Sequence, residues 1–299
     1  MTEFSGILTD LHIEFELNYS LSKASSFRVG GNADIAIFPR DEDEFALIIF
    51  EAQKRNIKFE VIGNGSNVLF SDDGYKGAII FTKNISEMVC NCNQITAFCG
   101  AKLPSLANLA RNNSLSGLEF AHGIPGSVGG AVAMNAGAFG GAMSDVLITS
   151  RALDINTRKI ITIDKNEHRF DYRKSIYSEN KNLICISAAF VLKDGDVFEI
   201  NEKMQENVRT RRLKQPVELP SCGSFFKRPE GYFAGKLIED CNLKGVSVGG
   251  AMVSQKHAGF IVNTGGATSS DIVSLAKLIE DTVFEKFGVK LEREVKYIF

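Results

Sequence analysis

Strand and helix signals alternate along the first hundred residues. A strand-like run from Asp34 to Phe38 ends at Pro39, and apolar residues from Phe45 to Ala52 then recur at helical spacing. Asp41 stands three residues before Glu44, as in a capping box, so we predict a helix over about residues 42–55. Shorter β-rich runs at 58–62, 78–81 and 95–99 predict three further strands. The order is strand, helix, strand, glycine loop and strand.

The middle of the chain favours helix first and strands afterwards. Residues 103–112 predict a helix, and the glycine-rich stretch 123–143 is interpreted as tightly packed loop and strand. Several β-type segments with turn signals follow over 148–192. A polar helix over about 198–214 ends in a basic cluster, and Pro216 and Pro220 predict a domain joint after it.

A last helix and strand close the chain. Ser269 or Ser270 is the expected N-cap, and Gly288 is the expected end of the helix. The expected apolar face consists of Ile272, Val273, Ala276, Leu278, Ile279 and Val283. Residues 289–299 predict a final strand.

Length and composition place this chain among ordinary globular proteins. It has 299 residues, 44% hydrophobic and 23% charged, which predicts two domains, or one large domain with a satellite. A net charge of -2, from 34 basic and 36 acidic residues, provides no excess of cations for binding nucleic acid. Nucleic acid is therefore not an expected partner, and no obligate protein partner is predicted.

The six cysteines and the N-terminus indicate a cytoplasmic protein. The cysteines show neither a CxxC pair nor a Cys/His zinc spacing, so we predict reduced thiols and no metal site. Glu3 places an acid where a signal peptide needs basic residues. The uncharged stretch 123–143 is too rich in glycine for a membrane span, so none is predicted.

Two glycine loops carry the first chemical signal. Residues 63–67 follow a strand but have Val68 where a dinucleotide fingerprint needs its third glycine, so this loop alone indicates either an anion-binding loop or a plain turn. The second loop, residues 122–131, is rich in glycine, so ordering it costs much conformational entropy. Such a loop is expected where the backbone must approach another group closely. Together the loops favour a bound phosphate ligand, although His122 alone is more often structural.

Four further segments make the pattern specific. They are Ser26–Gly31, Asp171–Ser175, Gly223–Pro229 and Leu291–Val295, and Met134–Gly137 lengthens the match. In this order and spacing, with the two loops, they closely resemble the UDP-N-acetylenolpyruvoylglucosamine reductase family, from about residue 20 to the end. The pattern is similar to the subgroup that lacks an extra tyrosine-bearing loop.

The resemblance implies an α+β protein with two domains. The expected domains are a vanillyl-alcohol-oxidase-type FAD-binding domain over 1–200 and a C-terminal α+β substrate-binding domain over 201–299, whose last strand returns to the active site. FAD would be held non-covalently. Its expected contacts are Gly63, Asn64, Gly65, Ser66, Asn67, Gly123, Pro125, Gly126, Ser127, Gly130, Ala131 and Gly137.

The implied reaction reduces UDP-N-acetylglucosamine enolpyruvate to UDP-N-acetylmuramate for peptidoglycan synthesis and so for the cell wall, cell shape and cell division. In the family, NADPH gives a hydride to flavin N5, which passes it to C3 of the vinyl ether. By its motif, Arg173 matches the residue that holds the substrate carboxylate, and Ser224 matches the serine that delivers a proton to C2. Glu294 matches the assisting glutamate, although strand alternation alone does not distinguish it from Glu292.

The substrate contacts implied are Tyr172, Lys214, Lys227, Arg228 and Asn263. Two positions depart from the usual motif, because Lys174 replaces an aspartate and Arg228 replaces an asparagine found in many relatives. Two alternatives remain from the sequence: another flavin oxidoreductase of this fold with a different substrate, and a nucleotide-sugar-binding protein without catalysis. The joint presence of Arg173, Ser224 and Glu294 argues against the second.

Overall fold

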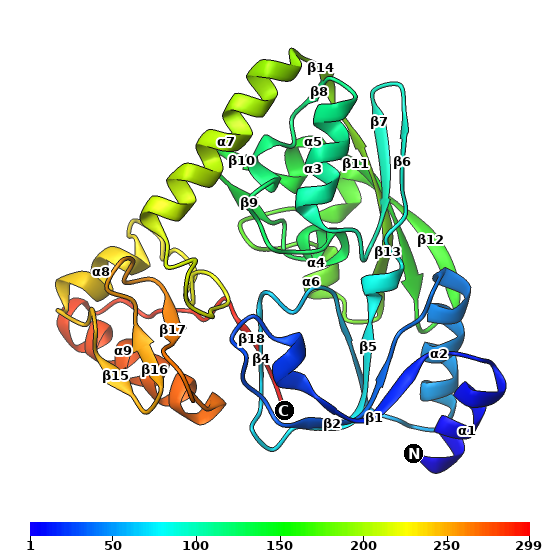
Figure 1. The fold of residues 1–299 in the computed structure, drawn as a ribbon, viewed down its shortest axis with the longest axis horizontal. Helices are drawn as coiled ribbons and strands as arrows, with labels where there is room; N and C mark the ends of the chain where they lie inside the picture. The colour runs from blue at the N-terminus through cyan, green and yellow to red at the C-terminus, as the bar shows by residue number, and fades with distance from the viewer. The chain divides into compact units, whose positions relative to one another are not determined.

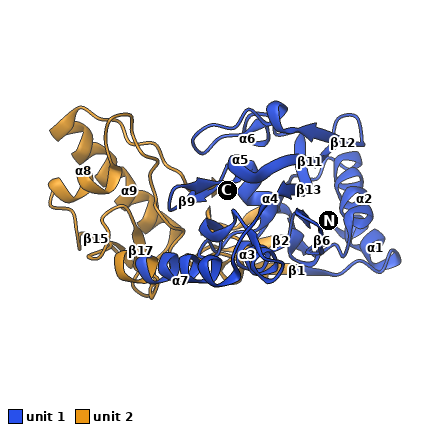
Figure 2. Ribbon diagram, turned by 90° about the horizontal axis from the view of Figure 1, so that it is seen from above, with its two compact units in different colours: residues 1–17, 35–64, 77–210 blue, residues 18–34, 65–76, 211–299 orange.

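A computed structural model describes all residues, 1–299, and divides the chain into two compact units (Figure 2). Unit 1 comprises residues 1–17, 35–64 and 77–210, and unit 2 comprises 18–34, 65–76 and 211–299. Two stretches of the N-terminal third therefore belong with the C-terminal part. The boundary that we expect between residues 200 and 201 stays a prediction. None of the helices has both the length and the apolar character needed to cross a bilayer.

A five-stranded antiparallel sheet organises unit 1. Its order is β12 (Lys159–Asp164), β11 (Leu147–Asp154), β13 (Leu183–Val191), β7 (Gln94–Phe98) and β6 (Met88–Asn91). The helices α3 (Leu103–Asn112) and α4 (Val128–Ala133) contribute Leu106 and Val132 to the core of this sheet, where they meet Ile95 and Phe190. This packing positions the second glycine loop, because the last residues of that loop, 128–131, lie in α4.

A second sheet has the order β1 (Phe15–Ser20), β2 (Asn32–Ile37), β5 (Tyr75–Phe81) and β3 (Phe59–Ile62), with β3 parallel to β5. Figure 1 labels the first three of these strands. In unit 1, Ile37 and Ile80 from these strands share a core with Phe4 of α1 (Thr2–Asp10) and Ile48 of α2 (Glu42–Lys54). Strands β1, β2 and β5 each contain residues of both units, because the boundaries at residues 17/18, 34/35 and 76/77 fall inside them. The first glycine loop begins directly after β3.

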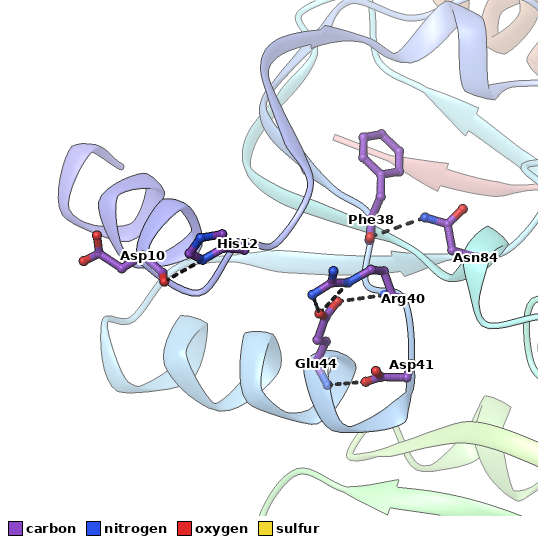
Figure 3. Close-up of polar contacts among 7 residues, drawn as sticks. All are labelled: Asp10, His12, Phe38, Arg40, Asp41, Glu44 and Asn84. Carbon is purple, nitrogen blue, oxygen red and sulfur yellow. Dashed lines mark hydrogen bonds and ion pairs between the residues drawn. The ribbon is translucent and has the colours of Figure 1, made fainter.

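The start of α2 shows how the predicted cap works (Figure 3). Asp41 Oδ1 accepts a hydrogen bond of 2.9 Å from Glu44 N, as predicted. The reciprocal bond goes one residue further back, because Glu44 Oε2 accepts from Arg40 N at 2.9 Å. Asn84, which follows β5, donates to Phe38 O at 3.4 Å, so the segment between β2 and α2 is tied to the turn after β5.

Unit 2 combines a short parallel strand pair, a small sheet and two helices. Strand β4 (Val68–Phe70) runs parallel to β18 (Lys296–Ile298), and β15 (Ser247–Val248), β16 (Ala251–Val253) and β17 (Ile261–Asn263) form an antiparallel sheet. Helices α8 (Ala234–Asp240) and α9 (Ser269–Phe287) bury Ile238 and Ile279 in one core with Leu69 and Phe225. The N-terminal insertion 65–76 therefore packs with the C-terminal segments within unit 2.

Short elements complete the chain. They are η1 (Leu21–Ala24), η2 (Thr82–Asn84), β8 (Leu115–Ser116), η3 (Glu119–Ala121), β9 (Gly137–Ala138), β10 (Gly141–Ala142), α5 (Met143–Val146), η4 (Lys165–His168), α6 (Ile176–Glu179), β14 (Lys193–Asp194) and α7 (Val197–Lys214).

The structure corrects the predicted start of the last helix, α9. Thr268 is the N-cap, since its hydroxyl accepts from Asp271 N at 3.0 Å, whereas the N–H of Ser269 donates to Asp72. The predicted end is confirmed, because Gly288 caps the helix with a φ of 68°. The apolar face includes Leu275, which the prediction omitted.

Two further details differ from the predicted pattern. Leu278 is 38% exposed and lies away from the buried face of α9. The final strand covers only residues 296–298, because the preceding residues pair with another segment, and the glycine-rich stretch 123–143 contains the helix α4 besides loop and strand.

Candidate active site

The two glycine loops meet within unit 1. Asn64 Nδ2 donates a hydrogen bond of 2.6 Å to Pro125 O, which joins the first loop to the second. Gly63 lies so close to the second loop that a Cβ there would be 2.1 Å from Ser127 Oγ and 3.2 Å from Ser127 Cβ. A side chain at residue 63 would therefore push the loops apart, so the glycine is required by close approach and not by a positive φ.

Two buried polar atoms in the second loop lack a hydrogen-bond partner within the chain. They are the hydroxyl oxygen of Ser127, a residue only 3% exposed, and Nδ1 of His122. Burial lowers the pKa of His122, and the charge of Arg111 lowers it further, so its ring is neutral near pH 7. Because buried polar groups are normally hydrogen-bonded, these atoms fit a polar ligand such as the FAD that the sequence predicts.

Backbone bonds hold the second loop against the sheet. Val128 N donates to Ala101 O and Gly129 N donates to Cys99 O, both at 2.8 Å, while Leu103 N donates to Gly126 O at 3.0 Å. The predicted cofactor residues Gly126 and Ser127 are therefore fixed before any ligand binds, and Gly130 and Ala131 follow in α4. Such prior ordering reduces the entropy lost on binding.

The second half of the first loop belongs to unit 2. Gly65 has a φ of 64°, and Ser26 N donates to its carbonyl at 3.1 Å. Asn67 Nδ2 donates to Glu294 O at 3.1 Å. Ser66, between them, is half-buried. The predicted cofactor residue Asn67 and the predicted acid Glu294 are therefore direct neighbours.

The predicted serine and glutamate lie on two segments that pair in antiparallel fashion. Phe226 bridges to Arg293, Glu294 N donates to Phe225 O at 2.8 Å, and Lys227 N donates to Glu292 O at 2.8 Å. This register places Glu294 opposite Phe225, the residue after Ser224. Both Ser224 and Glu294 are half-buried, as groups that must reach a substrate need to be.

Side-chain contacts within unit 2 anchor both of these segments. Arg293 makes a two-pronged ion pair with Glu280 of α9, at 2.6 and 2.9 Å, which holds the chain directly before Glu294. Cys222 donates its thiol to Val68 O at 3.2 Å, and burial raises its pKa to about 12. Cys222 is therefore a packed thiol, because so little thiolate forms near pH 7.

Arg173 lies in a tight turn of unit 1. Asp171 and Lys174 exchange backbone hydrogen bonds of 3.2 and 3.1 Å, and Arg173 between them has a φ of 56°. Its guanidinium donates to Gly137 O at 3.4 Å and lies 5.1 Å from the centre of the Tyr172 ring. Gly137, a predicted cofactor residue, and Arg173 are thus brought together.

Lys174, which departs from the usual motif, has a different neighbour. Its ammonium lies 2.6 Å from a carboxylate oxygen of Glu179 in α6, which raises the pKa of Lys174. The lysine therefore ties the turn to the helix that follows it.

The predicted substrate contacts have varied surroundings. Lys227 forms an ion pair with Glu292, and the Arg228 guanidinium lies 5.0 Å from the centre of the Phe233 ring. Lys214 is exposed at the end of α7, and Tyr172 is 47% exposed. Their binding roles stay predictions.

Asn263 has a different environment, because it is only 7% exposed. Its Nδ2 donates to Phe27 O at 2.9 Å, and its Oδ1 accepts from Gly265 N at 2.9 Å. The amide thus already joins two segments of unit 2. A contact with substrate stays a prediction for this residue too.

Sequence reasoning missed the residues that support the Arg173 turn. Asn135 Nδ2 donates to Asp171 O at 3.1 Å, and Ser175 Oγ donates to Ala133 O at 2.6 Å. Asn135 belongs to a matching motif but had no assigned role. No local pattern reveals such contacts, since about 40 residues separate the partners in sequence.

Comparison with known proteins agrees with this arrangement. Residues 33–164 match the model of an FAD binding domain, and residues 215–298 match that of the UDP-N-acetylenolpyruvoylglucosamine reductase C-terminal domain. A reductase of this name from Listeria monocytogenes EGD-e is 46% identical over 96% of this chain and 96% of its own length. One from Clostridium novyi NT is 44% identical over 95% of this chain and 92% of its own length.

Solved structures agree as well. The crystal structure of the reductase from Thermus caldophilus covers 96% of this chain and 99% of its own, with 32% identity and a TM-score of 0.80. The glucose dehydrogenase Phl p 4 matches 65% of this chain with a TM-score of 0.51 at 13% identity, which shows a shared fold only. These matches confirm the predicted fold class and the FAD cofactor. The chain therefore belongs to the UDP-N-acetylenolpyruvoylglucosamine reductase family.

Proposed function

We propose how individual residues of this chain carry out the reaction of its family. The protein is an NADPH- and FAD-dependent reductase that converts UDP-N-acetylglucosamine enolpyruvate to UDP-N-acetylmuramate in peptidoglycan synthesis. FAD, held by the two glycine loops, would supply the hydride chemistry between NADPH and C3 of the substrate. The protein must then stabilise negative charge near C2 and provide a proton there.

Arg173 binds the substrate carboxylate. Hydride addition at C3 spreads negative charge from C2 into the neighbouring carboxylate, so a fixed cation there lowers the barrier. The planar guanidinium suits two-pronged binding of a carboxylate. The support for this role is the ordered turn that holds Arg173, beside Gly137 of the predicted cofactor segment.

Ser224 delivers the proton to C2, and Glu294 assists it. The antiparallel pairing of residues 225–227 with 292–294 is the observation that carries this proposal, because it brings the two functional residues onto adjacent segments of unit 2. A serine hydroxyl is a poor acid, so its efficiency depends on alignment more than on its pKa. The Arg293–Glu280 ion pair maintains that alignment.

The two glycine loops bind the cofactor. Ser127 Oγ and His122 Nδ1 are buried polar atoms for which a bound dinucleotide would provide partners, and Gly63 lets the loops approach. The other predicted contacts from Asn64 to Asn67 and from Gly123 to Ala131 lie on these two loops, and Gly137 lies in β9, after α4.

The nucleotide half of the substrate binds to the cations of unit 2. Lys214, Lys227 and Arg228 offer positive charge for a diphosphate. Lys227 must exchange its ion pair with Glu292 for a phosphate, since a lysine serves as a point charge that can change partners. We place the reaction in the cytoplasm, where NADPH and the soluble precursor are found.

One experiment tests this function. The purified holoprotein should be yellow, should be bleached anaerobically by NADPH, and should regain its colour when UDP-N-acetylglucosamine enolpyruvate is added. Bleaching without recovery of colour would instead indicate a flavin oxidoreductase with another substrate. Protein that binds no flavin when refolded with excess FAD would be a nucleotide-sugar binder at most.

A further inference from the structure

A buried chain of hydrogen bonds joins both ends of the segment that carries Arg173. The Tyr177 hydroxyl lies 2.6 Å from Ser150 Oγ, and Ser150 Oγ lies 2.7 Å from His168 Nε2. His168 Nδ1 lies 2.8 Å from Asp164 O. Ser150, His168 and Tyr177 are 1%, 0% and 7% exposed, so water does not compete for these bonds. We call these three residues the Ser150 network.

Chemistry assigns a direction to every bond of the Ser150 network. A carbonyl only accepts, so His168 Nδ1 must donate to Asp164 O. Nε2 of the neutral ring is then an acceptor and receives the Ser150 proton. Ser150 in turn accepts from the Tyr177 hydroxyl. Each polar atom is satisfied in this single arrangement, and burial favours it by lowering the pKa of His168.

The network brackets the Arg173 turn. His168 and Tyr177 stand on either side of that turn in sequence, and both bind the same hydroxyl on strand β11. Phe170 stacks on the His168 ring, with centroids 4.9 Å apart. The ends of the segment are therefore held together, while Asn135 and Ser175 fasten its middle.

The turn needs such support. Arg173 has a φ of 56°, a left-handed conformation that is unfavourable for a residue other than glycine. A backbone of this kind persists only where its surroundings determine it. A guanidinium that binds a carboxylate with two prongs must also be held at a fixed place and angle.

We propose that Ser150, His168 and Tyr177 are positioning residues for Arg173: they close the segment around the turn, so that the substrate carboxylate meets a guanidinium already in place. This inference rests on the proposed role of Arg173. None of the three residues needs to touch the substrate.

The test compares two ligands and two half-reactions in Ser150→Ala. Binding of UDP-N-acetylmuramate, which carries the carboxylate, should weaken by about tenfold or more, since small misplacements of a binding group can cost up to about a hundredfold. Binding of UDP, which lacks the carboxylate, should stay the same. Anaerobic reduction by NADPH should also be unchanged, whereas reoxidation by the enolpyruvyl substrate should slow by a similar factor.

Two further variants separate positioning from loss of stability. Ser116→Ala removes another hydroxyl bond of unit 1, the 2.7 Å contact with Glu119, and should change neither ligand affinity nor reoxidation. In an Arg173→Lys background, Ser150→Ala should cause little additional loss, because residues that act through one group are not additive. Tyr177→Phe retains the ring and the Ser150–His168 bond, so it reports on the network if Ser150→Ala does not fold.

Three outcomes would overturn the proposal. They are equal weakening of UDP and UDP-N-acetylmuramate, equal slowing of both half-reactions, and full additivity of Ser150→Ala with Arg173→Lys. A wild-type protein that NADPH bleaches and the substrate does not reoxidise would refute the proposed function instead, so the two failures are distinguishable.

Discussion

The close approach of the two glycine loops makes Gly63→Ala the sharpest test of the cofactor site. The added Cβ would stand 2.1 Å from Ser127 Oγ, a separation that carbon and oxygen do not tolerate without a shift. Ser127 is buried, so its hydroxyl has little room to turn away. Overpacking of this kind costs about 1–3 kcal/mol.

That cost should divide between two measurable quantities. If the loops stay together in the apoprotein, the free energy of unfolding falls by that amount. If they separate, FAD binding weakens by about 5- to 140-fold, as 1.4 kcal/mol corresponds to a factor of ten. Urea denaturation of the apoprotein and fluorescence titration with FAD measure the two terms, and their sum should reach about 1–3 kcal/mol.

A second substitution identifies the cause. The remaining separation of 3.2 Å to Ser127 Cβ is tight but tolerable, so Ser127→Ala should recover most of the loss caused by Gly63→Ala. Ser127→Ala alone is the control for any bond between this hydroxyl and FAD. If Gly63→Ala changes neither stability nor FAD affinity, or if Ser127→Ala recovers nothing, the inferred contact between the loops is wrong.

Three other predictions concern the reaction and its pH dependence. Ser224→Ala should leave reduction by NADPH nearly intact and slow reoxidation by about a hundredfold or more, as stopped-flow absorbance can show; equal loss in both steps would contradict its role as proton donor. Arg173→Lys should impair reoxidation as well, because an ammonium lacks the planar fork, and unchanged reoxidation would remove Arg173 from the site. Burial lowers the pKa values of His122, His168 and His257 below 6.5 in the folded state, so they contribute stability above about pH 6.5 that is lost as the pH falls. The urea midpoint should therefore decrease on acidification from pH 7 to pH 5, and His168→Gln should reduce that decrease; a midpoint that rises would refute the assignment.

Local patterns were sufficient for the four longest helices, α2, α3, α7 and α9. The helix over residues 42–55 was predicted and is observed as Glu42–Lys54, because Asp41 supplies a cap and the apolar spacing supplies a buried face. Gly288 ends α9 as expected, since glycine adopts the left-handed conformation without penalty. These features depend on neighbours within one or two turns of the chain.

Predictions failed where a distant segment changed the local preference. Ser269 was an expected N-cap, but Asp72, almost 200 residues away, accepts its N–H, and Thr268 becomes the cap. The last strand is shorter than its β-rich sequence suggests, because residues 292–294 pair with residues 225–227. The sequence of neither segment indicates that the two segments pair with each other.

The sequence by itself determined the family, the cofactor and the identity of the motif residues, since six motifs in a fixed order carry that information. Only the tertiary structure decided which groups meet: Asn64 with Pro125, Glu294 with Asn67, and His168 with Tyr177 through Ser150. The physical reason is that hydrogen bonds and close packing act over a few ångströms in space, whereas these partners lie between 9 and more than 200 positions apart along the chain.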